Sequence, residues 1–177
     1  SRLSSEISDI LGHSIYAVDK IDIAEVAVGL AVEKGATFAA AESCTGGLIG
    51  HRITEVSGSS NAFLGGVVAY SNDVKQKGLG VQSSTLEKYG AVSAETVEEM
   101  AENVLSKFQA DYGLSVTGIA GPTGGTEDKP VGIVYIGLAK KGTVRVKKLQ
   151  FGEHRSRNKL RTSQAALNML RLALIHE

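Results

Sequence analysis

Residues 37–53 read TFAAAESCTGGLIGHRI, and this stretch sets the fold class of the chain. The short run of small apolar residues predicts a buried strand, and the apolar spacing after the glycines predicts a helix from about residue 45 to 56. Between them, a serine, a cysteine and a threonine stand side by side at a strand-to-helix corner. This corner indicates a βα unit.

Further helices are expected on both sides of this unit. Apolar residues recur at helical spacing, or capping signals occur, at 22–34, 73–76, 84–89, 93–109 and 156–175. Asn72 is the expected cap of the second of these segments. Ser84 and Glu87 have the spacing of a capping box for the third, which Gly90 is placed to end.

The remaining apolar runs complete a sheet. Strands are predicted at 63–70, 112–118, 131–139 and 143–151, the last two joined as a hairpin by KKG. Because βα units are combined with one hairpin, we expect an α/β fold, a mixed β-sheet sandwiched by helices in a three-layer α/β/α single domain. This domain is expected to span residues 22–177, and the polar residues 1–21 to be a lead-in or linker.

Composition limits the function classes. The 177 residues carry 19 Lys and Arg against 19 Asp and Glu, so no basic field favours nucleic acid. Four Phe, five Tyr and no Trp provide little for base stacking. No apolar run approaches the ~20 residues of a membrane span, and the lone Cys44 excludes an intrachain disulfide. A cytoplasmic enzyme or small-ligand binder fits best.

The corner after residue 42 is the first candidate site. A Ser43 hydroxyl at a helix N-terminus could attack a carbonyl while backbone N–H groups receive the oxyanion. The simpler interpretation is that Ser43 or Thr45 caps the helix and Cys44 is buried. None of the four histidines is placed to serve as the base, so a lysine with a lowered pKa is the alternative.

VVAYSNDVKQ (67–76) offers such a lysine. A chain reversal after Tyr70 could bring its phenol and the Lys75 amine to one side, so that Tyr70 relays a proton between Ser43 and Lys75. The alternative is a strand-end aromatic and a solvated lysine.

A glycine-rich loop is the second candidate site. SVTGIAGPTGGTEDKPVG (115–132) could cradle a phosphate with backbone N–H groups, helped by Lys129, although it matches neither a Walker A motif nor a dinucleotide fingerprint. Arg155 or Arg157, just before the last helix, could bind phosphate with two hydrogen bonds. The residues proposed for this binding are Gly118, Gly121, Gly124 and Gly125 with Thr117, Thr123 and Thr126.

Four motifs together carry a family resemblance. AESCTGG (41–47), GGVVAYSNDVK (65–75), GAVS (90–93) and the glycine-rich loop resemble, in order, the C-terminal domain of the competence/damage-inducible protein CinA. That family is known as nicotinamide-nucleotide amidases. The resemblance runs from about residue 23 to the C-terminus. It implies hydrolysis of nicotinamide mononucleotide to nicotinate mononucleotide and ammonia, in pyridine nucleotide recycling, without metal or organic cofactor.

The resemblance also assigns roles to residues. Ser43 is implied as the nucleophile, Tyr70 and Lys75 as its activating pair, and Thr117 as a residue that orients the reacting amide. In this mechanism the N–H groups of Cys44, Thr45 and Gly46 would hold the oxyanion, and Gly47, the loop glycines and an arginine the nucleotide. The family's arginine usually follows Gly-Asp, whereas this chain reads GEHR, so Arg155 is the best match and Arg157 stays open as the alternative.

The resemblance further implies partners. Members are commonly dimers or larger, and in two-domain members a molybdopterin-binding-like domain comes first, so we expect the chain to be the C-terminal part of such a protein. Two alternatives remain. One is a cysteine amidase that uses Cys44, since helix N-termini lower thiol pKa values. The other is a nucleotide-binding or regulatory module without catalysis.

Overall fold

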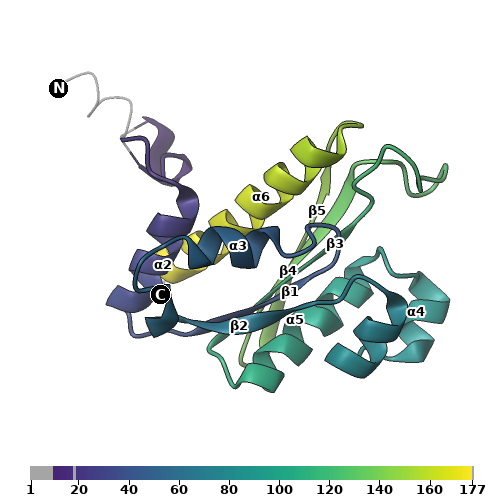
Figure 1. The fold of residues 1–177 in the computed structure, drawn as a ribbon, viewed down its shortest axis with the longest axis horizontal. Coiled ribbons are helices and arrows are strands. Elements are labelled where there is room, and N and C mark those ends of the chain that lie inside the picture. The colour runs from purple at the N-terminus through teal and green to yellow at the C-terminus, as the bar shows by residue number, and fades with distance from the viewer. Residues whose placement is uncertain (1–9, 18, 177) are drawn as a thin grey trace.

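The computed structural model describes residues 10–17 and 19–176, which form a mixed five-stranded sheet in the order β2-β1-β3-β4-β5. β1 is parallel to β2 and β3, whereas β4 is antiparallel to both β3 and β5 (Figure 1). The mixed sheet predicted from the sequence is confirmed. The strands are β1 (Phe38–Glu42), β2 (Phe63–Val68), β3 (Tyr112–Gly118), β4 (Ile133–Lys140) and β5 (Thr143–Gln150).

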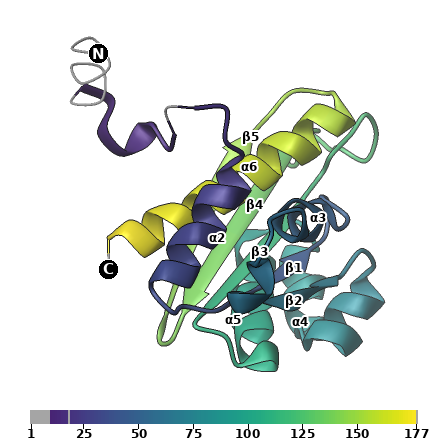
Figure 2. The same cartoon turned by 60° about the vertical axis from the view of Figure 1, so that its left-hand side comes forward.

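Helices cover both faces of this sheet, which confirms the three-layer architecture. The pleat of β1 directs Phe38 and Ala40 into one core and Ala39 and Ala41 into the other, so the strand is buried along its whole length. Figure 2 shows α2 and α6 on one face and α5 on the other. The first layer contains α2 (Ile23–Glu33), α3 (Leu48–Thr54) and α6 (Arg155–Ile175), and the second contains α4 (Ser83–Tyr89) and α5 (Ala94–Phe108).

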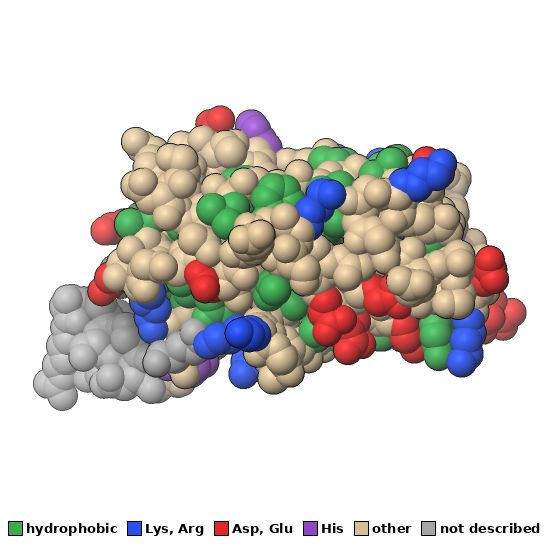
Figure 3. All heavy atoms as spheres, turned by 90° about the horizontal axis from the view of Figure 1, so that it is seen from below, with side chains coloured by type: hydrophobic (Ala, Val, Ile, Leu, Met, Phe, Trp, Pro, Cys, Tyr) green, Lys and Arg blue, Asp and Glu red, His purple; other side chains and the backbone are tan. Residues whose placement is uncertain are grey.

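Small residues in the central strands allow close packing of α5. A Cβ atom on Gly113 of β3 would lie 2.1 Å from the Ala101 carbonyl oxygen of α5, so only glycine fits there. The outer surface of α5 is acidic, with Glu98 and Glu102 exposed. Acidic side chains gather on the side of the molecule that Figure 3 shows.

Short turns complete the chain. The 3₁₀ turns η1 (Gly12–Ser14) and η2 (Ser59–Asn61) lie in connections, and the π-helical turn η3 (Val74–Gly78) follows β2. In the part of the chain that the structure describes, no helix is long and apolar enough to cross a membrane.

Three helix starts differ from the predictions. The segment after β2 is a π-helical turn, and the Ser71 hydroxyl, not Asn72, accepts the Val74 N–H at 3.2 Å. The predicted capping box of α4 is wrong, because the helix begins at Ser83 without a side-chain cap. Glu99 of α5 instead accepts the Gln82 N–H at 2.8 Å. The third difference, at α3, belongs to the candidate site.

Candidate active site

The carboxyl ends of the three parallel strands meet at one edge of the sheet, where ligands bind in open α/β folds. Ser43 directly follows β1, Tyr70 follows β2 and Thr117 lies near the end of β3. A cavity of about 200 Å³ opens there. It is lined by Ser43, Cys44, Tyr70, Asn72, Lys75, Ala91, Val92, Thr117, Gly118, Ala120 and Arg155.

Ser43 and Lys75 are in direct contact at the bottom of this cavity. Lys75 Nζ donates to Ser43 Oγ at 3.0 Å and to the Ala69 carbonyl oxygen at 2.9 Å. The Lys75 side chain is 2% exposed, and burial lowers its pKa below the ordinary 10.5 because the charged form is poorly solvated. Among the described residues no carboxylate pairs with Lys75. The lowered pKa favours the neutral amine, and a neutral amine beside a serine hydroxyl is a suitable base.

Tyr70 does not lie between these two groups. It is 60% exposed, and its hydroxyl accepts a hydrogen bond from Arg155 Nη2 at 2.6 Å. The expected relay from Ser43 through Tyr70 to Lys75 is therefore wrong for this conformation, since Lys75 reaches Ser43 without help. Tyr70 and Arg155 instead form one wall of the cavity.

Thr117 is completely buried and forms another wall. Its hydroxyl donates to the Ala91 carbonyl oxygen at 2.6 Å, which fixes the loop after α4 against β3. Because a hydroxyl has one proton and two lone pairs, Thr117 can still accept a hydrogen bond from a ligand.

The turn that carries Ser43 is held by a residue that the motif analysis did not single out. Glu42 is buried, and its carboxylate accepts the N–H groups of Gly47 (3.0 Å), Ile49 (3.0 Å) and Gly50 (2.8 Å). This carboxylate, and neither Ser43 nor Thr45, caps α3. The sequence signal that could have indicated this role is a single acidic residue at the end of an otherwise apolar strand.

These contacts reduce the set of backbone N–H groups that could hold an oxyanion, compared with the set expected from the sequence. The Gly46 N–H donates to the Ser43 carbonyl oxygen at 3.1 Å, so it is not free to hold an oxyanion as expected. The Gly47 N–H is also engaged, and Gly47 lines a separate hollow and not the cavity. In the described part of the chain, the N–H groups of Cys44 and Thr45 donate to no backbone carbonyl oxygen.

Cys44 lies beside Ser43 but has the wrong protonation state for a nucleophile. Burial raises the pKa of its thiol to about 12, and the negative charge of Glu42 adds to this. A hydrogen bond from its own backbone N–H, and the positive charges of Lys75 and Lys159, oppose the shift only partly. Since the thiolate is the reactive form, the environment counts against a cysteine nucleophile.

The glycine-rich loop reaches the cavity only at its base. Gly118 lines the cavity, and the Gly121 carbonyl oxygen accepts from Arg155 Nη1 at 3.0 Å. Gly124 and Gly125 are exposed and do not line the cavity, which contradicts the expected four-glycine cradle. Lys129 turns away as well, because its Nζ donates to the Tyr89 carbonyl oxygen at 2.6 Å.

The start of α6 brings one of the two arginines to the cavity. Arg155 lines the cavity, whereas Arg157 is exposed and does not. One turn further, the buried Asn158 donates to the Ala120 (3.0 Å) and Gly152 (2.7 Å) carbonyl oxygens and anchors the loop. Sequence reasoning missed Lys159, whose Nζ lies 3.7 Å from where a Gly46 Cβ would be.

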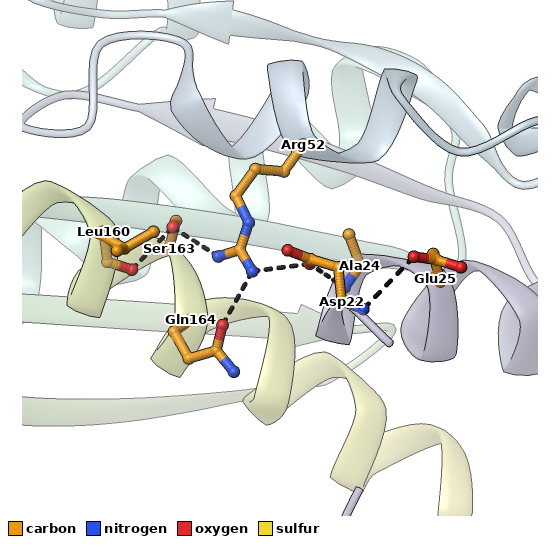
Figure 4. Close-up of polar contacts among 7 residues, drawn as sticks. All are labelled: Asp22, Ala24, Glu25, Arg52, Leu160, Ser163 and Gln164. Carbon is orange, nitrogen blue, oxygen red and sulfur yellow. Dashed lines mark hydrogen bonds and ion pairs between the residues drawn. The ribbon is translucent and has the colours of Figure 1, made fainter. Parts of the chain in front are cut away.

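A polar cluster anchors α3 behind the site (Figure 4). Arg52 of α3 donates to Ser163 Oγ (2.8 Å) and Gln164 Oε1 (2.8 Å) of α6. It also pairs with Asp22, the N-cap residue of α2, at 2.7 Å. The helix that follows the Ser43 turn is therefore fixed to two other helices.

Comparison with known proteins places the chain in a family and a fold. The CinA C-terminal domain family matches residues 20–174. A Thermoanaerobacter sp. (strain X514) relative, named as a candidate competence-damage inducible protein, is 53% identical over 98% of this chain. The chain spans only 42% of that relative, and also 42% of a 47% identical CinA-like protein from Kosmotoga olearia.

Solved structures share the fold. The competence/damage inducible protein CihA from Agrobacterium tumefaciens superposes with a TM-score of 0.83 at 40% identity, covering 89% of this chain and 98% of that one. A CinA superfamily protein from Klebsiella pneumoniae gives a TM-score of 0.84 at 26% identity, covering 88% and 97%.

Proposed function

The chain belongs to the CinA C-terminal domain family, and on this premise we propose that it hydrolyses the carboxamide of nicotinamide mononucleotide to nicotinate mononucleotide and ammonia. The observation that carries the proposal is the contact between Lys75 and Ser43. A buried lysine with a lowered pKa, 3.0 Å from a serine hydroxyl, is an arrangement suited to nucleophilic catalysis.

Acylation starts with the neutral amine of Lys75. As Ser43 Oγ bonds to the carboxamide carbon, its proton moves to Lys75 Nζ and the carbonyl electron pair moves to oxygen. The Cys44 and Thr45 N–H groups are the donors available for this oxyanion. When the oxyanion collapses, the C–N bond breaks, and the Lys75 ammonium returns its proton to the leaving nitrogen, which departs as ammonia.

Deacylation uses the same groups in reverse order. Water attacks the acyl-serine carbon while Lys75 accepts its proton, and collapse of the second oxyanion breaks the bond to Ser43 Oγ. The proton on Lys75 then restores the serine hydroxyl. The product forms as the carboxylic acid, gives its proton to the released ammonia or to solvent, and leaves as the carboxylate with the ribose phosphate attached.

The walls of the cavity fit a pyridine nucleotide. Tyr70 offers an aromatic surface for the ring, and Arg155, exposed at the same wall, offers a guanidinium to the phosphate. Lys159, close to the Gly46 turn, adds a second positive charge. Thr117 can accept from the amide N–H, because its own proton is already donated to Ala91.

The wider assignment follows the family and is part of the proposal. Residues 22–177 form the amidase unit, and residues 1–21 lead into it from a preceding CinA domain, as the 42% coverage of the relatives supports. The unit acts in the cytoplasm as a homo-oligomer in pyridine nucleotide recycling. Neither a membrane nor a nucleic acid is a partner in this proposal.

Ammonia release from nicotinamide mononucleotide tests the proposal, with free nicotinamide as the substrate control. Wild type, Ser43→Ala, Lys75→Ala and Cys44→Ala are compared. We expect turnover in wild type and Cys44→Ala and none in the other two. Turnover in Ser43→Ala but not in Cys44→Ala would establish the cysteine alternative. Ligand-dependent stabilisation of wild type without ammonia release would establish a binding module.

A further inference from the structure

Glu42 directly precedes Ser43 and is buried, with 3% of its surface exposed. Placing a carboxylate in a protein interior costs free energy unless hydrogen bonds or a cation compensate. Among the described residues no cation pairs with Glu42. Its compensation comes from the three N–H groups at the start of α3. The carboxylate thus occupies the place where an anionic ligand could bind a helix N-terminus.

The main chain between Glu42 and these donors forms a closed turn. Ser43 donates its N–H to the Val116 carbonyl oxygen of β3 at 3.0 Å, and its own carbonyl oxygen accepts from Gly46. Gly46 and Gly47 have φ angles of +59° and +93°. Two adjacent glycines in the left-handed region leave many conformations accessible to an unrestrained turn. The Glu42 carboxylate restrains it, because one side chain joins the strand end to the helix start.

Both functional elements of the proposed amidase lie inside this closed turn. One is the Ser43 hydroxyl, whose direction decides whether it meets Lys75. The other is the pair of N–H groups of Cys44 and Thr45, the donors left for an oxyanion. A helix cap could stabilise α3 equally well from a serine or threonine at the N-cap position. The N-cap residue here is Gly47, which has no side chain. The capping carboxylate belongs to Glu42, which precedes Ser43 in the sequence, so the nucleophile lies between the capping residue and the helix.

We propose that Glu42 is a positioning residue for catalysis, whose carboxylate holds the Ser43–Gly47 turn so that Ser43 Oγ meets Lys75 and the Cys44 and Thr45 N–H groups stay free. This inference rests on the serine chemistry of the proposed function and does not depend on which amide is the substrate. Glu42 itself touches neither the substrate nor the transferred proton.

A fluorophosphonate probe tests Ser43 without any assumption about the substrate. Ser43 Oγ bonds to phosphorus, fluoride leaves, and the serine proton is taken by Lys75. The second-order labelling rate constant is measured for wild type, Glu42→Gln and Glu42→Asp. Ammonia release from nicotinamide mononucleotide is measured in parallel, with kcat and KM determined separately.

Asp111→Asn is the matched control, because Asp111 holds the opposite end of β1. Its carboxylate accepts the Thr37 N–H at 2.7 Å and the Thr37 hydroxyl at 2.8 Å. Removing it weakens a carboxylate-to-backbone contact of the same kind at Thr37, the residue before β1 and away from Ser43. Thermal unfolding of each variant gives the stability loss against which the labelling rates are compared.

We expect Glu42→Gln to label about tenfold more slowly or worse, since small misplacements of reacting groups are costly. We expect kcat to fall with KM nearly unchanged, and the pH midpoint of labelling to stay, because Lys75 is intact. Glu42→Asp is expected to label only slightly faster than Glu42→Gln, because the shorter Asp side chain does not reach all three N–H groups. Asp111→Asn is expected to label at the wild-type rate.

Labelling of folded Glu42→Gln within twofold of wild type would overturn the proposal and leave Glu42 a helix cap. An equal loss of labelling rate in Asp111→Asn would also overturn it. If Glu42→Gln does not fold, the labelling rate of Glu42→Asp is compared with the rates of wild type and Asp111→Asn instead. A wild type that is labelled at Ser43 but releases no ammonia refutes the proposed substrate alone, while labelling still decides the role of Glu42. A wild type that resists labelling and releases no ammonia refutes both; if it resists labelling but releases ammonia, kcat of Glu42→Gln against Asp111→Asn decides the role of Glu42.

Discussion

Lys75 Nζ lies 3.0 Å from Ser43 Oγ, although 32 residues separate the two in the sequence. β1 and β2 are parallel neighbours, so the segments that follow them begin at the same edge of the sheet. The π-helical turn after β2 then directs the lysine inward, where it is buried without a carboxylate partner among the described residues. Burial lowers the pKa of Lys75 and makes the neutral base accessible nearer to physiological pH.

The rate of amide hydrolysis is predicted to rise with pH as Lys75 loses its proton, with the midpoint of kcat/KM below 10.5. Replacing Lys75 by Met keeps a long apolar side chain but removes the base. We expect a loss of about 10²- to 10⁴-fold in kcat, the range for a general base. The measurement is ammonia release from pH 5 to 10. A wild-type profile that is flat over this range contradicts the assignment of Lys75.

Lys75→Met is predicted to be more stable than wild type at neutral pH. The folded-state pKa of Lys75 is lowered, so the unfolded chain binds more protons between that pKa and the ordinary value of 10.5. Wild-type stability therefore rises with pH through this window, and the advantage of the variant shrinks and disappears above 10.5. Urea unfolding at several pH values measures the difference. A variant that is less stable at pH 7 contradicts the prediction.

The fold was predictable where the signals are local. β3 ends as predicted at Gly118, and Ser93 caps α5 through the Thr96 N–H at 3.1 Å. The start of α4 was not predictable from local spacing, because its first free N–H is held by Glu99 from another helix. A contact across 17 residues leaves no signature in a capping-box pattern.

The sequence could predict which residues of the candidate site gather at the ends of the parallel strands, but not how their side chains are directed. Parallel strands bring Ser43, Lys75 and Thr117 to one edge, so their gathering follows from the order of elements. The direction of the Tyr70 hydroxyl does not follow, since its partner Arg155 is 85 residues away. The contact between Tyr70 and Arg155 depends on how far the Arg155 side chain extends from α6. The glycine content of the loop could not show that Gly124 lies outside the cavity.

Cys44 is predicted to be dispensable for catalysis and slow to react. With a thiol pKa of about 12, very little thiolate exists at pH 8, so iodoacetamide should modify the folded protein far more slowly than free cysteine. Cys44→Ala should keep activity within a few-fold and lower the free energy of unfolding by about 1 kcal/mol through lost packing. Alkylation kinetics in native and denaturing buffer provide the measurement. Rapid native alkylation coupled to loss of activity would point to the thiol.

Arg155 and Arg157 form a matched pair for testing phosphate recognition. Only Arg155 lines the cavity, and both are exposed at the start of α6. Loss of a charge-assisted hydrogen bond of about 1.5–3 kcal/mol predicts a roughly 10- to 150-fold rise of KM for nicotinamide mononucleotide in Arg155→Ala. Arg157→Ala should behave as wild type. Equal effects of the two variants would indicate a general charge effect instead of a specific contact.

Tyr70→Phe separates a wall residue from a proton relay. The phenol accepts a hydrogen bond from Arg155, and Lys75 contacts Ser43 directly, so removing the hydroxyl leaves the proton path intact. We expect kcat within about threefold of wild type and a KM rise of less than tenfold, because Arg155 loses one neutral acceptor worth about 1 kcal/mol. The ring still covers the cavity wall. Steady-state kinetics of Tyr70→Phe beside Tyr70→Ala test this: a fall of 10²-fold or more in kcat for the phenylalanine variant would restore the relay, because no other loss in that variant acts on the chemical step.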